Sequence, residues 1–202
     1  MSGASPALVL ASGSAARAAL LRNAGLRFEV AAAALDEAEI KAGFRAEGGD
    51  AEPCALALAA AKAARVSRRR PGALVIGADQ LLVCEGSWYD KPADMTAARA
   101  QLLALRGRAH ELVTAVCAMQ DGTQIWHAVE RPRLVMRAFG EEFLDAYLAS
   151  CGEDILASVG AYRLEDLGVQ LFARIEGDFF SILGLPLLPL LEFLRAHGTV
   201  GR

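Results

Sequence analysis

Short apolar segments alternate with helix-forming segments along the first half of the chain. Several apolar residues in a row favour a buried strand, whereas apolar residues spaced three and four apart favour an amphipathic helix. The polar segment after the second strand contains two consecutive glycines, so we expect it to be rich in loops. The elements predicted in this half are strands at Leu8–Ala11 and Phe28–Ala31, helices at Ala15–Asn23 and Ala55–Val66, and the loop-rich segment Ala32–Asp50.

The second half of the chain is rich in strand signals and contains one clear hairpin turn. Asp121-Gly122 lies between two β-rich segments, and Asp-Gly is a strong hairpin signal. Thr96 is expected to cap the helix that follows it. The predicted strands are Leu74–Ala78 and Leu81–Cys84 (one strand broken at Asp79, or two consecutive strands), Glu111–Met119, Gln124–Met136 and Val169–Ile175, and the predicted helices are Ala97–Leu105, Glu141–Ala149 and Leu187–His197.

The order of these elements predicts an α/β fold with a mixed sheet. Strands and helices interleave, which favours parallel pairing, but the two strands of the central hairpin must pair antiparallel. We find no internal repeat, no low-complexity linker and no change of composition that would mark a domain boundary. The chain is therefore expected to form a single domain, residues 1–202.

Composition and charge argue against some classes of partner. The formal net charge is −3, so the surplus of Lys and Arg that marks nucleic-acid-binding proteins is missing. The apolar segment from Phe179 to Leu194 is too short to span a bilayer, and Pro186 and Pro189 interrupt it. Scattered cysteines without metal-site spacing, and no visible signal peptide, favour a cytoplasmic protein with reduced thiols. We therefore expect neither nucleic acid nor a membrane as a partner.

The first predicted strand ends in a Ser-Gly-Ser turn that can bind an anion. Ser12 and Ser14 supply hydroxyl groups, the start of the next helix supplies N–H groups, and Arg17 adds a positive charge. Phosphate is the expected ligand, although the spacing matches neither a Walker A loop nor a dinucleotide-binding glycine motif. The alternative is that Ser12 only caps the helix and Arg17 is a solvated surface residue.

Asp79 is the first candidate for the chemistry, because it interrupts an apolar run. A carboxylate in such surroundings is unfavourable unless it is paired or binds a metal; the alternative is a strand break at which Asp79 caps a turn. Glu37 is a second candidate, and the alternative interpretation is an ordinary exposed acid in a loop. Lys62 is a third, and the alternative is a lysine that extends its charged end from an Ala-rich helix into solvent. Lys91 precedes Pro92, which favours an extended backbone and fixes the direction of the side chain.

Four motifs, in this order, resemble the Maf family of nucleoside triphosphate pyrophosphatases. They are the opening S-x-S-x-x-R, Asp79-Gln80, Lys91-Pro92 and Gly184-Leu-Pro186, and the resemblance extends from about Leu8 to Leu194. It implies two lobes around a long twisted mixed sheet flanked by helices, with the substrate cleft between the lobes. It also implies hydrolysis of the α–β phosphoanhydride of a nucleoside triphosphate to the monophosphate and pyrophosphate.

The resemblance also assigns roles to the candidate residues. Asp79 matches the family's catalytic base or metal-organising carboxylate, and Glu37 would hold Mg²⁺ or Mn²⁺ together with it. The cationic side chains would balance the roughly four negative charges of a triphosphate. A nucleoside triphosphate is the expected partner and a divalent cation the expected cofactor, and a homodimer is left open. The substrate-binding residues implied are Ser12, Ser14, Arg17, Lys62 and Lys91.

The resemblance implies that three positions distinguish the subfamilies of the Maf family: Ala16, Gln80 and Glu165. Gln80 and Glu165 match the type that acts on 7-methyl-GTP, and a glutamate can accept hydrogen bonds from both N1–H and the exocyclic amine of a guanine. Ala16 departs from both types, because Ala15-Ala16 replaces a Pro followed by Arg or Trp. The alternatives are a dTTP/UTP pyrophosphatase of the same family and a non-hydrolysing nucleotide-binding regulator of cell division.

Overall fold

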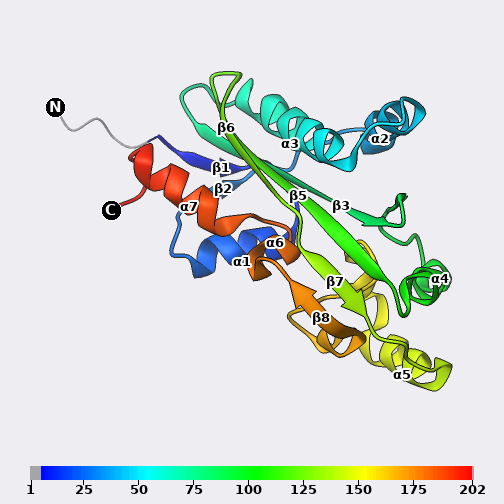
Figure 1. Cartoon of the computed structure of the whole chain (residues 1–202). Coiled ribbons are helices and arrows are strands. Elements are labelled where there is room, and N and C mark those ends of the chain that lie inside the picture. The colour runs from blue at the N-terminus through cyan, green and yellow to red at the C-terminus, as the bar shows by residue number, and fades with distance from the viewer. Residues whose placement is uncertain (1–5, 202) are drawn as a thin grey trace. The chain divides into compact units, whose positions relative to one another are not determined.

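The chain folds into an α/β structure built on a mixed sheet. A computed structural model describes residues 6–201 (Figure 1). The strand order in the sheet is β2-β1-β3-β5-β7-β8, with β4 paired to β3 and β6 paired to β5. The α/β class and the mixed sheet predicted from the sequence are confirmed. The strands are β1 (Leu8–Leu10), β2 (Glu29–Val30), β3 (Leu74–Cys84), β4 (Ser87–Tyr89), β5 (Ala109–Gln120), β6 (Thr123–Glu130), β7 (Arg133–Met136) and β8 (Phe172–Glu176).

The chain divides into two compact units. The first unit comprises residues 6–79, 114–130 and 184–201, and the second unit comprises residues 80–113 and 131–183. β3 and β5 contribute residues to both units. Within residues 6–201, no helix combines the length and the apolar character needed to cross a membrane. The helices are α1 (Ala15–Asn23), α2 (Glu37–Ala46), α3 (Ala51–Ser67), α4 (Met95–Leu105), α5 (Glu141–Cys151), α6 (Phe179–Ile182) and α7 (Leu187–Ala196), with 3-10 turns η1 (Gly152–Ala157) and η2 (Leu167–Leu171).

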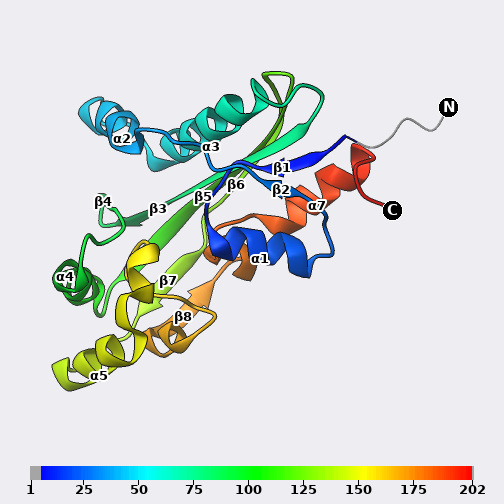
Figure 2. The same cartoon turned by 180° about the vertical axis from the view of Figure 1, so that it is seen from behind.

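In the first unit, helices cover both faces of the sheet. β1 pairs parallel with β2 and with β3, and β5 pairs antiparallel with β6. α3 lies on one face of these strands, and α1 and α7 lie on the other (Figures 1 and 2). The predicted hairpin turn is confirmed, because Asp121 and Gly122 connect β5 to β6 and both have positive φ, as a tight two-residue hairpin requires.

Gly77 lets α3 approach β3 very closely. A Cβ at position 77 would overlap the backbone oxygen of Ala59 and lie 2.9 Å from the Cβ of Ala63. Only glycine fits such a close approach of helix and strand backbones. Lys62 lies between these two alanines in the sequence of α3, and Asp79 lies two residues after Gly77 on β3. The close packing therefore fixes the backbone of α3 beside the strand that carries Asp79.

The prediction that Ala32–Asp50 is rich in loops is wrong, because this segment contains α2. The N-cap is Asp36, whose Oδ1 accepts a hydrogen bond from the backbone N–H of Glu39 at 3.2 Å. None of the residues of α2 is buried, and its apolar face is short, with Ile40 and Phe44 half-buried one helical turn apart, so the two glycines after it outweighed this signal. An acid followed three residues later by Glu is nevertheless a recognisable capping signal. Glu37 therefore lies in the first turn of a helix rather than in a loop.

Some predicted boundaries also differ from the structure. β3 is one continuous strand through Asp79, with no break. α4 is capped by Asp94, whose Oδ1 accepts from the N–H of Ala97 at 2.7 Å, and not by Thr96. The predicted strand Gln124–Met136 is divided into β6 and β7 around Pro132, which has no N–H to donate to a ladder.

In the second unit, antiparallel strands and helices share one apolar core. β4 pairs antiparallel with β3, and β7 pairs antiparallel with both β5 and β8. α4, α5 and η1 contact one another. The core of this unit is apolar and includes Leu102, Leu105, Leu134 and Leu144, each fully buried. Tyr162 and His110 are also buried there, so this core contains polar atoms that need partners.

His110 lies in this core as a neutral imidazole. Its Nε2 shares a hydrogen bond of 2.8 Å with the hydroxyl group of Tyr162, and its Nδ1 has no hydrogen-bond partner among the described residues. Burial lowers the pKa of His110 to about 4.

We expect His110 to make the protein acid-sensitive. An unfolded histidine binds a proton as the pH falls through about 6.5, but the folded His110 resists protonation down to about pH 4. Stability is therefore fully present above pH 6.5 and falls by at most about 3 kcal/mol between pH 6.5 and 4. Urea unfolding of wild type and His110→Gln across this range measures the effect. The variant should show a flatter pH dependence than wild type; equal slopes for wild type and His110→Gln would contradict the assignment.

Candidate active site

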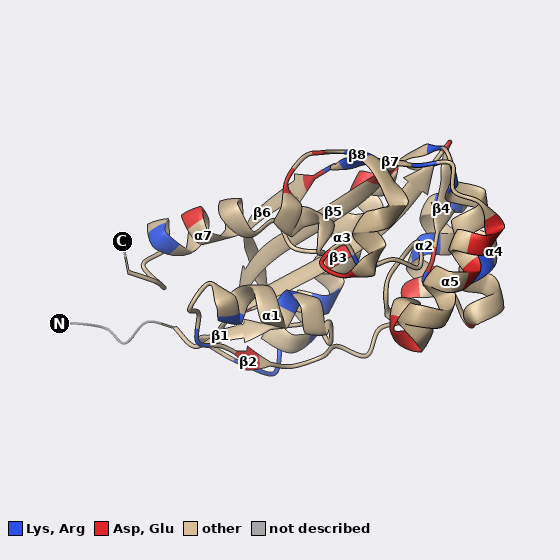
Figure 3. Cartoon of the chain, turned by 90° about the horizontal axis from the view of Figure 1, so that it is seen from below, with Lys and Arg blue, Asp and Glu red and all other residues tan. Residues whose placement is uncertain are grey.

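The turn after β1 forms the N-terminal cap of α1. The hydroxyl of Ser14 accepts a hydrogen bond from the backbone N–H of Arg17 at 3.4 Å. The hydroxyl of Ser12 accepts from the N–H of Ser14 at 3.3 Å. The only charged residues of α1 are Arg17 and Arg22, so the helix appears in Figure 3 with blue segments and no red ones. Ser14 is therefore the cap, and the helix carries positive charge from its first turn onward.

Arg17 is buried and held by three hydrogen bonds. Its Nε donates to the backbone oxygen of Gly184 at 2.7 Å, and its Nη1 donates to the hydroxyl of Ser12 at 3.1 Å and to the backbone oxygen of Ala78 at 3.0 Å. Only 9% of Arg17 is exposed, so the alternative of a solvated surface arginine is wrong. The remaining nitrogen, Nη2, makes no hydrogen bond to the described residues. Its two N–H groups are the ones that can donate to a ligand.

Lys62 forms ion pairs with two acids from different elements. Its Nζ lies 2.5 Å from Oδ1 of Asp79 on β3 and 2.8 Å from Oε1 of Glu37 at the start of α2. Lys62 and Asp79 are buried, whereas the Glu37 side chain is 41% exposed. The alternative in which Lys62 extends its charge into solvent is therefore wrong. A buried carboxylate in an apolar strand is here balanced by a buried ammonium group, which explains why β3 continues through Asp79.

Arg17 belongs to the same electrostatic environment as these three residues. Burial lowers the pKa of Arg17 from its ordinary value, and the negative charges of Asp79 and then Glu37 act in the opposite direction. Two cationic and two anionic side chains, Arg17, Lys62, Glu37 and Asp79, thus form a cluster of balanced charge in the first unit. A site of this composition can bind a phosphate chain and can accept a proton from water.

The cluster contains two carboxylates that fit a divalent cation. The second oxygen of Asp79, Oδ2, is buried and has no hydrogen-bond partner within residues 6–201. Carboxylate oxygens are the ligands that Mg²⁺ and Mn²⁺ prefer, and Mg²⁺ commonly binds through one or two carboxylates plus substrate phosphates and water. The described residues contain no group of three or more His, Cys, Asp or Glu arranged to hold a metal. Glu37 and Asp79 would therefore need ligands from substrate and water.

The remaining predicted site residues belong to the second unit, except for Ala16, which is half-buried beside Arg17 on α1. Gln80 begins the second unit, and its Nε2 donates to the backbone oxygens of Ser181 at 2.9 Å and Ile182 at 3.2 Å. Lys91 is exposed after β4, in the second unit. Glu165 also belongs to the second unit. The predicted roles of these residues stay predictions.

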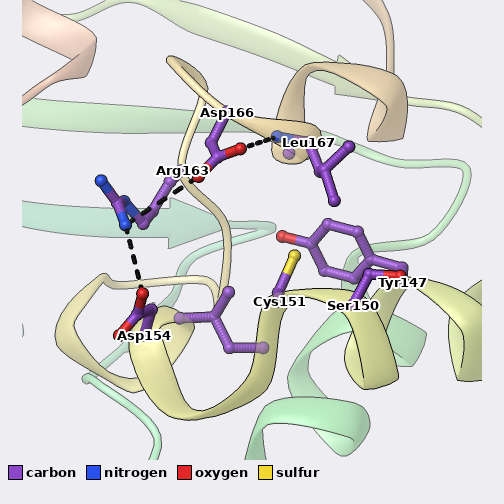
Figure 4. Close-up of a pocket in the computed structure, with 9 residues that line it drawn as sticks. Tyr147, Ser150, Cys151, Asp154, Arg163, Asp166 and Leu167 are labelled. Carbon is purple, nitrogen blue, oxygen red and sulfur yellow. Dashed lines mark hydrogen bonds and ion pairs between the residues drawn. The ribbon is translucent and has the colours of Figure 1, made fainter.

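A small polar pocket of the second unit is lined by Arg163 and Asp166, which flank Glu165 in the sequence (Figure 4). Oε1 of Glu165 accepts from Nε of Arg163 at 3.3 Å, and Nη1 of Arg163 lies 3.7 Å from Asp154 and 4.0 Å from Asp166. Arg163 and both aspartates line the pocket, which has a volume of about 100 Å³. On its far wall the hydroxyl of Tyr147 donates to the backbone oxygen of Ala161 at 3.2 Å. Arg163 thus restrains the carboxylate that the resemblance assigns to base recognition.

The model of the family described as Maf-like protein matches residues 7–197. The chain belongs to the Maf family. This Maf protein is 58% identical over 190 residues to a nucleoside triphosphate pyrophosphatase of Granulibacter bethesdensis, with 94% of this chain and 96% of the relative covered. It is 56% identical over 192 residues to another of that name from Paramagnetospirillum magneticum, covering 95% and 99%. A 7-methyl-GTP pyrophosphatase of Mesorhizobium japonicum is 49% identical over 193 residues, covering 96% and 97%.

The candidate site also contains groups that the sequence did not single out. The backbone oxygens of Ala78 and Gly184 orient Arg17, and backbone atoms carry no residue-type signal. Gly184 was noted as part of a motif, and its role is now clear: its φ is 102°, and a Cβ there would lie 3.3 Å from Nε of Arg17. In the second unit, Arg163 was not singled out as the ion-pair partner of Glu165, although its position two residues earlier is a pattern that a search for ion pairs can find.

Proposed function

We propose that this Maf protein hydrolyses the α–β phosphoanhydride of a nucleoside triphosphate, releasing a nucleoside monophosphate and pyrophosphate. The observation that carries the proposal is the buried cluster in which Lys62 joins Asp79 to Glu37, next to Arg17. The names of the relatives, which match nearly the whole chain, support the same reaction class.

Asp79 is the residue proposed to activate water. Its Oδ1 is occupied by Lys62, so its unpartnered Oδ2 is the atom that accepts a hydrogen bond from the attacking water and then its proton. The ammonium group of Lys62 balances the carboxylate charge and holds its orientation through a short hydrogen bond. The base is thereby fixed before substrate arrives, which is the preorganisation that catalysis requires.

Cationic and hydroxyl groups are proposed to bind the phosphates. Arg17 presents Nη2 while its other nitrogens are fixed by Ser12, Ala78 and Gly184, so a contact with phosphate needs little ordering of the side chain. Lys62 supplies a second positive charge from the same unit. Ser12, Ser14 and Lys91 are proposed to complete the phosphate contacts, as the resemblance implies.

Glu37 and Asp79 are proposed to hold Mg²⁺ or Mn²⁺. Such an ion, when bound, polarises phosphoryl oxygens and lowers the pKa of bound water. Asp79 would offer Oδ1, the atom that now contacts Lys62, and keep Oδ2 for the attacking water, while the half-exposed Glu37 has room to change its partner. Both residues donate oxygen ligands only, which suits a hard cation.

The preferred base is proposed to be a guanine, and 7-methyl-GTP the preferred substrate. Gln80 and Glu165 carry this part of the proposal through the family resemblance, and the names of some relatives support it. The carboxylate of Glu165 can accept from two donors of a guanine, whereas O2 and O4 of a pyrimidine offer it none.

The decisive assay measures pyrophosphate release from a panel of nucleoside triphosphates, with and without Mg²⁺ or Mn²⁺. We expect release of one pyrophosphate per monophosphate formed, with the highest kcat/KM for 7-methyl-GTP. Binding of nucleotide without release of pyrophosphate from any member of the panel would instead support the non-hydrolysing regulator. Higher kcat/KM for dTTP or UTP would overturn the base assignment and leave the reaction class intact.

Glu165→Gln is expected to reduce the preference for guanine bases. The amide keeps one acceptor and loses the charge, so the ratio of kcat/KM for 7-methyl-GTP to that for UTP should fall by about tenfold or more, since one such hydrogen bond is worth about 1–3 kcal/mol. The variant Glu153→Gln, at an acid of the same unit, provides the control. An unchanged ratio in folded Glu165→Gln would show that this carboxylate does not recognise the base.

The cytoplasmic location, the homodimer and the single-domain organisation of residues 1–202 stay predictions. The finding that no helix within the described residues can cross a membrane does not test any of these three predictions.

A further inference from the structure

Lys62 occupies the position that a cation shared by Glu37 and Asp79 would need. Its Nζ is within 2.8 Å of Oε1 of Glu37 and within 2.5 Å of Oδ1 of Asp79. An ion that binds both oxygens must lie between them, and the ammonium group already lies there. Two cations cannot share this space, both because their volumes overlap and because their charges repel. The ion pair and a metal bridging the same oxygens therefore exclude each other.

The two acids are the only charged partners of Lys62 among the described residues. Lys62 makes no hydrogen bond or ion pair to other described groups, and its side chain is 10% exposed. The ammonium group thus supplies the charge that these carboxylates would otherwise take from a metal. In a buried position this neutralisation is worth more than on the surface, because the local dielectric is lower.

The backbone at Lys62 is fixed, but its side chain is flexible. α3 is pressed against Gly77 of β3 by Ala59 and Ala63, so the helix cannot shift to move the charge. The four-carbon stem of a lysine can nevertheless redirect its ammonium group by rotation about its own bonds. Arg17 differs in this respect, since three hydrogen bonds from Nε and Nη1 hold its guanidinium group in place. Lys62 is therefore the cation of the cluster that can exchange one anionic partner for another.

We propose that Lys62 closes the Glu37–Asp79 site to divalent cations until a polyphosphate draws its ammonium group away. This inference rests on the proposed function, because it takes a triphosphate as the ligand. The phosphate chain offers Lys62 new anionic oxygens, and the carboxylates that it leaves become available to the metal. Metal and nucleotide then bind as a unit, and the protein alone has little affinity for the metal. Lys62 acts here as a positioning residue for the metal site, in addition to any contact with phosphate.

The test is binding of Mn²⁺ to the full chain, measured by the electron paramagnetic resonance signal of the free ion. Wild type should bind Mn²⁺ weakly without nucleotide, and at least tenfold more tightly with an α,β-methylene nucleoside triphosphate, after subtraction of the Mn²⁺ held by nucleotide alone. Lys62→Gln should bind Mn²⁺ without nucleotide at least tenfold more tightly than wild type. Arg65→Gln removes one positive charge from an exposed position of the same helix and should behave as wild type.

Two results would overturn the inference. One is tight binding of Mn²⁺ by wild type without nucleotide, which needs no variant and so stands even where Lys62→Gln folds poorly. The other is folded Lys62→Gln with wild-type Mn²⁺ affinity. A rise of Tm with Mn²⁺ that is larger for Lys62→Gln than for wild type, and that is lost in Glu37→Gln/Lys62→Gln, would place the gain at these carboxylates. Pyrophosphate release, assayed separately, reports on the proposed function: release together with tight nucleotide-free Mn²⁺ binding rejects this inference alone.

Discussion

Asp79→Asn is expected to lower kcat for pyrophosphate release by two or more orders of magnitude while the protein stays folded. The amide has almost the same shape as the carboxylate but cannot accept a proton from water, and loss of a general base commonly costs 10²–10⁴-fold, or about 3–5 kcal/mol of barrier. Lys62 keeps its contact with Glu37 in the variant, so the charged cluster retains one ion pair. Steady-state release of pyrophosphate at saturating substrate is the measurement.

Asp36→Asn is the matched control for this variant. Asp36 is next to Glu37 and caps α2 through its Oδ1, and Asn caps helices about as well as Asp. The same chemical change is thus made close to the cluster without touching its carboxylates, and kcat should remain near that of wild type. Near-normal kcat in Asp79→Asn, with a native circular dichroism spectrum, would remove Asp79 from the proposed mechanism.

Gly77→Ala is expected to reduce both stability and activity. The added methyl group meets the backbone oxygen of Ala59, which cannot move aside as a side chain can. Inserting one carbon into a well-packed core costs about 1–3 kcal/mol, and overlap with helix backbone belongs at or above the upper end of that range. Because α3 must then move away from β3, the Lys62–Asp79 contact should lengthen and kcat should fall. Urea unfolding and pyrophosphate release measure the two effects.

Gly43→Ala is the comparison for Gly77→Ala. Gly43 lies inside α2, and a Cβ there meets nothing within 4 Å. Alanine favours a helix over glycine by about 1 kcal/mol, so stability should stay the same or rise. If Gly77→Ala unfolds at the same urea concentration as wild type, the close packing of α3 on β3 does not carry the stability we assign to it.

The limits of prediction from this sequence are clearest at α2 and β3. α2 has Ile40 and Phe44 one helical turn apart and carries the capping signal of Asp36 and Glu39, but the nearby glycines outweighed both signals. At β3 a single acid suggested a break, because an unpaired carboxylate in a buried strand is unfavourable. The partner that removes this penalty, Lys62, lies 17 residues away on another element. The local sequence pattern therefore shows that the buried carboxylate of Asp79 needs a partner, but it does not show which distant residue provides it.

The sequence predicted which residues form the candidate site better than it predicted the contacts that they make. Arg17, Lys62, Glu37 and Asp79 were all identified, and the structure brings these four together. That Arg17 is anchored by the backbone of Gly184, 167 residues further on, could not be predicted, because a carbonyl group is present in every residue. The position of a buried cation thus depends on tertiary packing, whereas its presence is visible as a charge next to a turn.

The uninterrupted β3 has a consequence for how the substrate range of this enzyme can evolve. Successive side chains of a strand point to opposite faces, and Asp79 and Gln80 accordingly have separate partners: Lys62 for the one, and the backbone of Ser181 and Ile182 for the other. Under the base-recognition role proposed for Gln80, a substitution there can alter base preference without disturbing the Lys62–Asp79 ion pair. An insertion or deletion of one residue in β3 would exchange the two faces and abolish both properties together. Selection for new bases should accordingly accept point substitutions at position 80 and reject any change in the length of the strand.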